Sequence, residues 1–171
     1  EPLLNADMNR TVNLSLGIGC LVLEQYDEAL FFIKRGITLF RDGVRDEHDS
    51  TARLLLLLVS YNMNSSRLFD AEYRSAYAFF YKRKRKHVFE KELLQCLHHT
   101  FYMKDNKKKI AAFKETLAVF ENNREDVVQQ MAFSIFNYPG WLMSRIQRIS
   151  YRQFTEKMVQ SNKRESIAAI A

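Results

Sequence analysis

The residues best suited to chemistry in this chain are four histidines and two cysteines, because imidazole and thiolate groups bind metals and carry out catalysis. His98 and His99 are adjacent and would point about 100° apart on a helix, whereas shared metal ligation favours a spacing of three or four. Cys20 and Cys96 are far apart and neither has a partner at metal-binding or redox spacing. The sequence therefore predicts no metal, no cofactor and no disulfide, and it favours a reducing, intracellular location in the cytoplasm.

Two other patterns resemble catalytic motifs but have simpler interpretations. Gly17-Ile18-Gly19 resembles a phosphate-binding loop, yet it lies inside a helical pattern and no Gly-Lys-Ser/Thr follows it. The acids of Asp46–Asp49 and Glu125-Asp126 stand where helices are expected to begin, and there they would stabilise the positive end of the helix dipole. No serine has the spacing of a nucleophile elbow. We therefore expect no catalytic residues and a protein that is not an enzyme.

Positive charge is the remaining chemical feature, and it is concentrated in one segment. The net charge is +6, but residues 81–109 alone carry a local excess of seven, so the rest of the chain carries one net negative charge. The candidate contacts for nucleic acid or for an acidic partner are Lys82, Arg83, Lys84, Arg85 and Lys86, and then Lys107, Lys108 and Lys109. Since a helix is expected between the two clusters, about 25 Å separates them, and we expect two patches rather than one.

The two clusters differ in how well local structure explains them. Lys82–Lys86 should end a helix, where cations interact favourably with the negative end of the dipole. Lys107–Lys109 should open a helix, where cations are disfavoured, so this cluster is the stronger candidate for an acidic partner. The aromatic residues Phe69, Tyr73, Tyr77 and Phe80 share one helical face, and we favour buried packing over a base-stacking platform for them.

The spacing of apolar residues at three and four predicts an all-α chain, with breaks at Gly43, at Asn64-Ser65-Ser66 and at Tyr138-Pro139-Gly140. The expected helices are 9–24, 27–41, 50–62 with Ser50 as N-cap, 66–86, 87–103, 107–120 and 125–136, and residues 141–149 and 151–160 are expected to make one or two final helices. We expect one domain over residues 1–160, made of hairpins at about 9–41, 50–86, 87–120 and 125–160, with a frayed tail over 161–171. The longest apolar run, Leu54–Val59, is far shorter than the roughly 20 residues of a membrane span.

The first hairpin carries a family pattern. Leu16, Gly17, Cys20, Tyr26, Ala29 and Gly36 stand at the offsets of the tetratricopeptide repeat, and residues 10–43 resemble one such repeat. Asn13 stands where the family often has Trp, and no Pro follows at residue 41. Later counterparts recur every 41 to 42 residues, longer than the standard unit, and Trp141–Ile146 is faintly similar to the ends of large bacterial proteins of this family.

The resemblance implies a right-handed α-solenoid of antiparallel hairpins with a divergent C-terminal cap. It also implies a concave groove, formed by the first, third and fifth helices, that binds a peptide. We therefore expect a non-catalytic protein–protein interaction scaffold. We also expect the chain to be part of a longer protein. The alternative is a helical module that binds nucleic acid or another anion through residues 81–109. Homo-oligomers are compatible with either function.

Overall fold

The computed structural model describes residues 2–38, 46–82 and 87–168, and these residues are helical with short turns and no strand. The all-α prediction is therefore confirmed for the described part of the chain. The helices are α1 (Pro2–Val22), α2 (Tyr26–Thr38), α3 (Asp46–Asn62), α4 (Ser66–Lys82), α5 (Val88–Phe101), α6 (Asn106–Asn122), α7 (Val127–Ile135), α8 (Tyr138–Gln147) and α9 (Tyr151–Ala168). The predicted stop at Gly43 and the cations 83–86 lie outside the described residues.

Most predicted turns are present, and side chains or left-handed residues close them. Asn64 has a φ of 52° between α3 and α4, a conformation that asparagine adopts more readily than most residues. Asp126 caps α7, because its carboxylate accepts a hydrogen bond from the Gln129 amide at 2.9 Å. This is the capping role expected for the Glu125-Asp126 pair.

Four predicted helix boundaries are wrong. Helix α1 begins at Pro2 rather than near residue 9. Ser50 is no N-cap, because α3 begins at Asp46 and buries Ser50. Pro139 opens α8 rather than ending a helix, since proline fits the first turn, where its missing N–H has no partner to lose. Asn137 caps this turn by accepting a hydrogen bond from the Gly140 amide at 2.8 Å. The tail is also helical further than expected, because α9 continues past Gln160 to Ala168.

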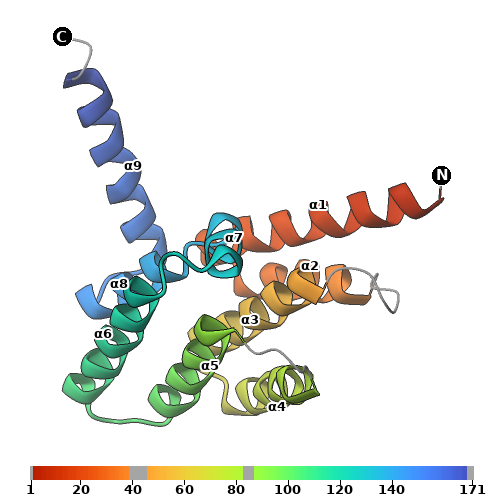
Figure 1. The fold of residues 1–171 in the computed structure, drawn as a ribbon, viewed down its shortest axis with the longest axis horizontal. Helices are drawn as coiled ribbons and strands as arrows, with labels where there is room; N and C mark the ends of the chain where they lie inside the picture. The colour runs from red at the N-terminus through yellow and green to blue at the C-terminus, as the bar shows by residue number, and fades with distance from the viewer. Residues whose placement is uncertain (1, 39–45, 83–86, 169–171) are drawn as a thin grey trace.

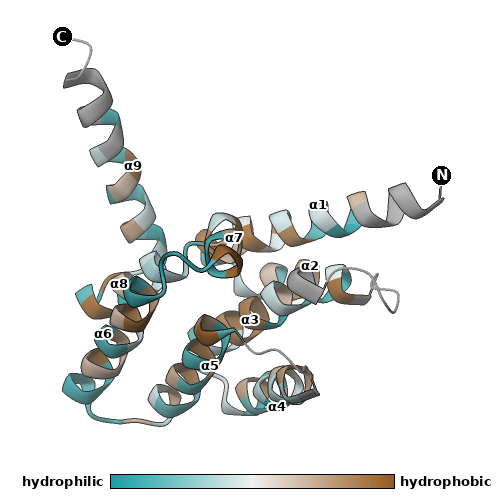
Figure 2. Ribbon diagram, in the orientation of Figure 1, coloured by the Kyte–Doolittle hydropathy of each residue, from teal (hydrophilic) through white to brown (hydrophobic). Residues whose placement is uncertain are grey.

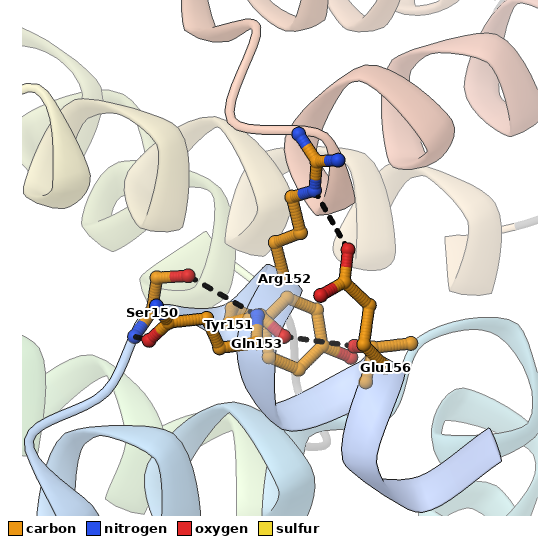
Figure 3. A network of polar contacts seen from close by, with 6 residues as sticks. Ser150, Tyr151, Arg152, Gln153 and Glu156 are labelled. Carbon is orange, nitrogen blue, oxygen red and sulfur yellow. Dashed lines mark hydrogen bonds and ion pairs between the residues drawn. The ribbon is translucent and has the colours of Figure 1, made fainter. Parts of the chain in front are cut away.

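The start of α9 shows why this helix begins where it does (Figure 3). The Ser150 hydroxyl accepts a hydrogen bond from the Gln153 amide at 3.1 Å, and the Ser150 amide donates to Gln153 Oε1 at 3.2 Å. This reciprocal pair satisfies two amides at the helix start. One turn on, Arg152 and Glu156 form an exposed ion pair at 2.9 Å. Together these contacts begin a helix that extends away from the body of the molecule (Figure 1).

The centre of the fold is α3. Helix α1 pairs with α2, α3 with α4, and α5 with α6, while α3 also contacts α1, α2, α5 and α7. Every side chain from Leu54 to Val59 is at most 4% exposed. Figure 2 shows hydrophobic residues concentrated in central helices such as α3 and α5, whereas much of α9 is hydrophilic. The six-residue apolar run is therefore the middle of a helix that other helices surround.

The expected last unit, residues 125–160, is made of three helices, α7, α8 and α9, close to the helices expected there. Helix α8 packs on α6 and α9, and its inner face also reaches α3. The rings of Trp141 and Tyr61 lie 5.6 Å apart between centroids, and Arg145 Nη2 donates to Asn62 Oδ1 at 2.6 Å. The C-terminal helices thus fold back onto the middle of the chain.

Candidate binding surfaces

The residues that carry the repeat pattern differ in how closely they are packed. A Cβ on Gly17 would overlap Ile33 Cγ1 and lie 3.2 Å from the Ile33 amide nitrogen, and Ala29 and Ile33 are fully buried. A Cβ on Gly36 would meet its nearest atoms only at 3.8 Å, an ordinary contact. Gly17 is therefore the small residue that the crossing of α1 and α2 requires, and Gly36 is not.

The other pattern residues are less buried. Cys20 and Tyr26 are half-buried against the core. Leu16 is 46% exposed and so does not fill the space between α1 and α2. The packing role expected for Leu16 is therefore wrong.

The groove expected along the first, third and fifth helices is not open at its middle helix. The apolar residues of α3 are buried on all sides, and α7 lies against this helix. Trp141 and Tyr138 of α8 are both fully buried, and the Tyr138 ring lies 6.3 Å from that of Phe89 in α5. The chain's own C-terminal helices occupy the surface where a peptide was expected.

The aromatic face of α4 divides into a buried and an exposed part. Phe69 and Phe80 are buried, as the preference for packing predicts, but Tyr77 is 50% exposed and Tyr81 is 68% exposed. Successive tyrosine rings follow one another along the helix, with centroids 6.0 Å apart from Tyr73 to Tyr77 and 6.1 Å apart from Tyr77 to Tyr81. The exposed rings form an ordered row instead of a core face.

This row of rings forms one wall of a hollow of about 240 Å³ between α4 and α5, which we call the tyrosine groove. Its lining includes Tyr73, Tyr77 and Tyr81 of α4 and Lys91, Leu94 and Gln95 of α5. His98 of α5 stacks on Tyr73 at 4.2 Å between ring centroids, which fixes the inner end of the row. Most of the groove's exposed lining is apolar, so it can hold an apolar side chain.

The charges around the tyrosine groove are unevenly accessible. Glu90 is 2% exposed, and its carboxylate accepts a hydrogen bond from the His87 amide at 3.4 Å at the start of α5. Lys91 is exposed and meets Glu92 only at 4.0 Å. Burial, followed by the neighbouring Tyr77, raises the pKa of Tyr73, so its hydroxyl stays protonated and can donate. The accessible charge at the groove is therefore positive.

The second basic cluster, Lys107–Lys109, occupies the first turn of α6, as predicted. Asp105 is the N-cap, and its Oδ1 accepts hydrogen bonds from the amides of Lys107 at 2.8 Å and Lys108 at 3.2 Å. This carboxylate offsets the unfavourable position of three cations at a helix start. Lys107 and Lys108 are exposed, but Lys109 is half-buried beside a second hollow. Of the first cluster, Lys82 ends α4, and residues 83–86 lie outside the described residues.

The second hollow, which we call the cationic hollow, has a volume of about 280 Å³. Its lining includes Tyr61 of α3, Asn106, Lys109 and Phe113 of α6, Arg145 of α8 and the following residue Arg148. The spacing of residues in the sequence contains no signal for this site. Arg145 and Arg148 lie about 40 positions after Lys109, and only the packing of α8 on α6 brings them together.

Other chemistry has little support in the described part of the chain. No group of three or more His, Cys, Asp or Glu side chains within it could hold a metal ion. The Cys96 thiol is buried, and burial raises its pKa to about 11, which makes it a poor nucleophile. Within residues 2–38, 46–82 and 87–168, no helix combines the length and apolarity that crossing a bilayer requires.

Comparison of the chain with known protein families, with curated proteins and with solved structures returned no match. The candidate surfaces therefore have to be interpreted from their own chemistry.

Proposed function

We propose that this protein is a non-catalytic interaction scaffold related to tetratricopeptide proteins, with hairpins α1–α2, α3–α4 and α5–α6 stacked as a short solenoid and α7–α9 as its divergent cap. The order of helix contacts supports this proposal, because α3 touches both helices of the preceding hairpin and α5 touches both helices of the hairpin before it. The tetratricopeptide-like spacing of Gly17 and Ala29 around Ile33 supports it at the level of packing.

The observation that carries the proposal is the tyrosine groove. Two tyrosines with 50% and 68% of their surface exposed stand on a helix whose other aromatic residues are largely buried. Tyrosine contributes a large, rigid contact area and a hydroxyl, and it is enriched in the residues that dominate protein interfaces. Because α4 and α5 are held together by stacked rings, the groove is preformed and a partner would not have to order it.

Charge indicates which partner suits the tyrosine groove. Lys91 lines it, and the cationic sequence Lys82–Lys86 follows Tyr81 directly in the chain. Glu90 is buried and presents little negative charge to a ligand. We therefore infer that the partner is an acidic peptide with one apolar or aromatic anchor, whose anchor enters the groove and whose carboxylates are attracted to Lys91 and to the positive charge of this part of the sequence.

A selection of random peptides displayed on phage tests this proposal. The protein is expected to enrich acidic peptides that contain a large apolar residue, and the double variant Tyr77→Ala/Tyr81→Ala should weaken their binding by about tenfold or more. Met158→Ala in α9 is the matched control, because Met158 is a similarly exposed apolar residue far along the chain. Circular dichroism would verify that each variant remains helical. Basic peptides, no enriched peptide, or affinity unchanged by the tyrosine substitutions would each reject the proposal.

A second candidate function is the binding of single-stranded nucleic acid, which one observation favours. Tyr77 and Tyr81 are exposed aromatic rings next to five consecutive cations in the sequence, and exposed rings beside cations can stack bases and contact phosphates. Fluorescence anisotropy of a labelled oligonucleotide would detect this activity. Its affinity should fall steeply between about 50 mM and 200 mM salt and should be lost after charge reversal at 82–86 and 107–109. No binding at low salt would eliminate this function.

A further inference from the structure

The cationic hollow has a composition that neither the scaffold function nor the core explains. Lys109, Arg145 and Arg148 line it together with Tyr61 and Phe113, and no acidic residue is among its lining residues. We propose that this hollow binds a small organic phosphate, with the phosphate group against the three cations and the organic part against the two rings. The site is separate from the tyrosine groove and does not depend on the proposed function.

Arg145 provides the main argument, because it is a largely buried guanidinium without a carboxylate partner. Its Nη2 donates to the neutral Asn62 side chain at 2.6 Å, and its guanidinium carbon lies 4.9 Å from the centre of the Trp141 ring. Its Nε is buried and makes no hydrogen bond, and among the described residues no Asp or Glu forms an ion pair with it. A largely buried charge that forms no ion pair is costly, so an incoming anion would be stabilised there.

The pKa of Arg145 reflects the same surroundings. Burial lowers this pKa, and the neighbouring Tyr26, Tyr61 and Glu24 partly offset the effect. Glu24 is thus the carboxylate that acts on Arg145 electrostatically, from beyond ion-pair distance. Asp105, the acid nearest in sequence to Lys109, already accepts two amide hydrogen bonds at the start of α6. Neither carboxylate therefore forms an ion pair with the cations of the hollow in the described part of the chain.

The other two cations stand at the edge of the hollow. Arg148 follows α8 as its C-cap with a φ of 56°, a left-handed conformation in which glycine would be less strained. Its amide donates a hydrogen bond to the Arg145 carbonyl at 3.2 Å, which holds the Arg148 backbone next to that of Arg145. Lys109 approaches from α6, and neither side chain makes an ion pair among the described residues. Both positive charges are therefore available to a ligand.

The size and lining of the hollow select the class of ligand. A volume of about 280 Å³ equals roughly nine waters at about 30 Å³ each, which exceeds the five heavy atoms of inorganic phosphate. Tyr61 and Phe113 provide an apolar surface for the remaining atoms. Three cations suit a phosphate monoester, whose charge near neutral pH is about −1.5 to −2, better than a carboxylate of charge −1. A phosphate on a ring or short apolar group fits both features.

Titration calorimetry with phenyl phosphate tests the assignment, with inorganic phosphate and benzoate as comparison ligands. Phenyl phosphate should bind more tightly than either, because only it uses both the cations and the rings. Lys109→Gln and Arg148→Gln should each weaken binding by about tenfold, the loss expected for one charge-assisted contact. Lys107→Gln is the matched control, since Lys107 lies in the same turn of α6 but does not line the hollow.

These variants avoid Arg145, whose removal could disturb the packing of α8. Absence of saturable binding would overturn the proposal. Equal weakening by Lys107→Gln and Lys109→Gln would also overturn it, because the attraction would then be a diffuse effect of surface charge. If inorganic phosphate or benzoate bound as tightly as phenyl phosphate, the assigned ligand class would be wrong. Tyr77→Ala/Tyr81→Ala should leave phenyl phosphate binding unchanged, which separates this test from that of the tyrosine groove.

Discussion

Two glycines of α1 should respond to the same substitution with opposite changes in stability. Alanine favours a helix over glycine by about 0.8–1.0 kcal/mol, so Gly17→Ala and Gly19→Ala gain a similar amount from the backbone. The Cβ added at Gly19 meets no atom within 4 Å, whereas the Cβ added at Gly17 overlaps Ile33 Cγ1. Forcing an extra methyl into a packed site costs about 1–3 kcal/mol or more. We expect Gly19→Ala to stabilise the protein by up to about 1 kcal/mol and Gly17→Ala to destabilise it.

Urea unfolding followed by far-UV circular dichroism would measure this difference, and the gap between the two variants should be about 1–3 kcal/mol. In thermal scans each kcal/mol should appear as a shift of about 2–4 °C. Ile33→Ala supplies the critical background, because it removes the atom that the new methyl group would strike. In that background Gly17→Ala should become neutral or stabilising. If Gly17→Ala is as stable as Gly19→Ala in the parent chain, the close crossing of α1 and α2 at Ile33 is wrong.

Two further predictions concern buried hydroxyl and thiol groups. The Tyr138 hydroxyl is buried without a hydrogen-bond partner in the described structure, so Tyr138→Phe should raise the free energy of unfolding by about 1 kcal/mol, measured in urea. A decrease of similar size would mean that the hydroxyl forms a hydrogen bond, with Thr51 as the candidate partner. Burial raises the pKa of Cys96 from 9.0 to about 11 and that of Tyr151 from 10.0 to about 12, so both favour folding in their neutral form. Their contribution to the free energy of unfolding is complete below pH 9 and is lost as pH rises through 11 and 12. For Cys96 alone, about 2 kcal/mol of this free energy should be lost by about pH 10.5. Urea unfolding at several pH values measures this loss, and Cys96→Ala should reduce it; an unchanged profile in that variant would contradict the assignment.

The sequence was sufficient to predict the helices and most of their turns, because apolar spacing and capping residues act locally. Asp126 and Asn64 function at the turns where they were expected. Pro139 misled the prediction because proline marks either the end or the first turn of a helix, and only the Asn137 cap decides which. Ser50 misled it for a similar reason, since serine suits an N-cap but is also tolerated inside a helix when it is buried and bonded.

The candidate surfaces were less predictable, because they depend on contacts between distant segments. Helical spacing placed Tyr73 and Tyr77 on one face of α4, but it could not indicate that α5 would leave Tyr77 half exposed. The basic residue Lys109 was identified in the sequence, while its neighbours Arg145 and Arg148 were not. A hollow whose lining residues come from three separate helices has no sequence period of its own.

The central position of α3 has a consequence for how the molecule unfolds. In an open repeat array each unit contacts only its neighbours, so end units can unravel one at a time. Here the Arg145–Asn62 hydrogen bond joins residues 83 positions apart, and the Trp141 ring packs edge-to-face against the Tyr61 ring. Removal of α8 would expose the centre of the fold rather than shorten it. Helices α3 and α8 are therefore expected to unfold together as one cooperative unit.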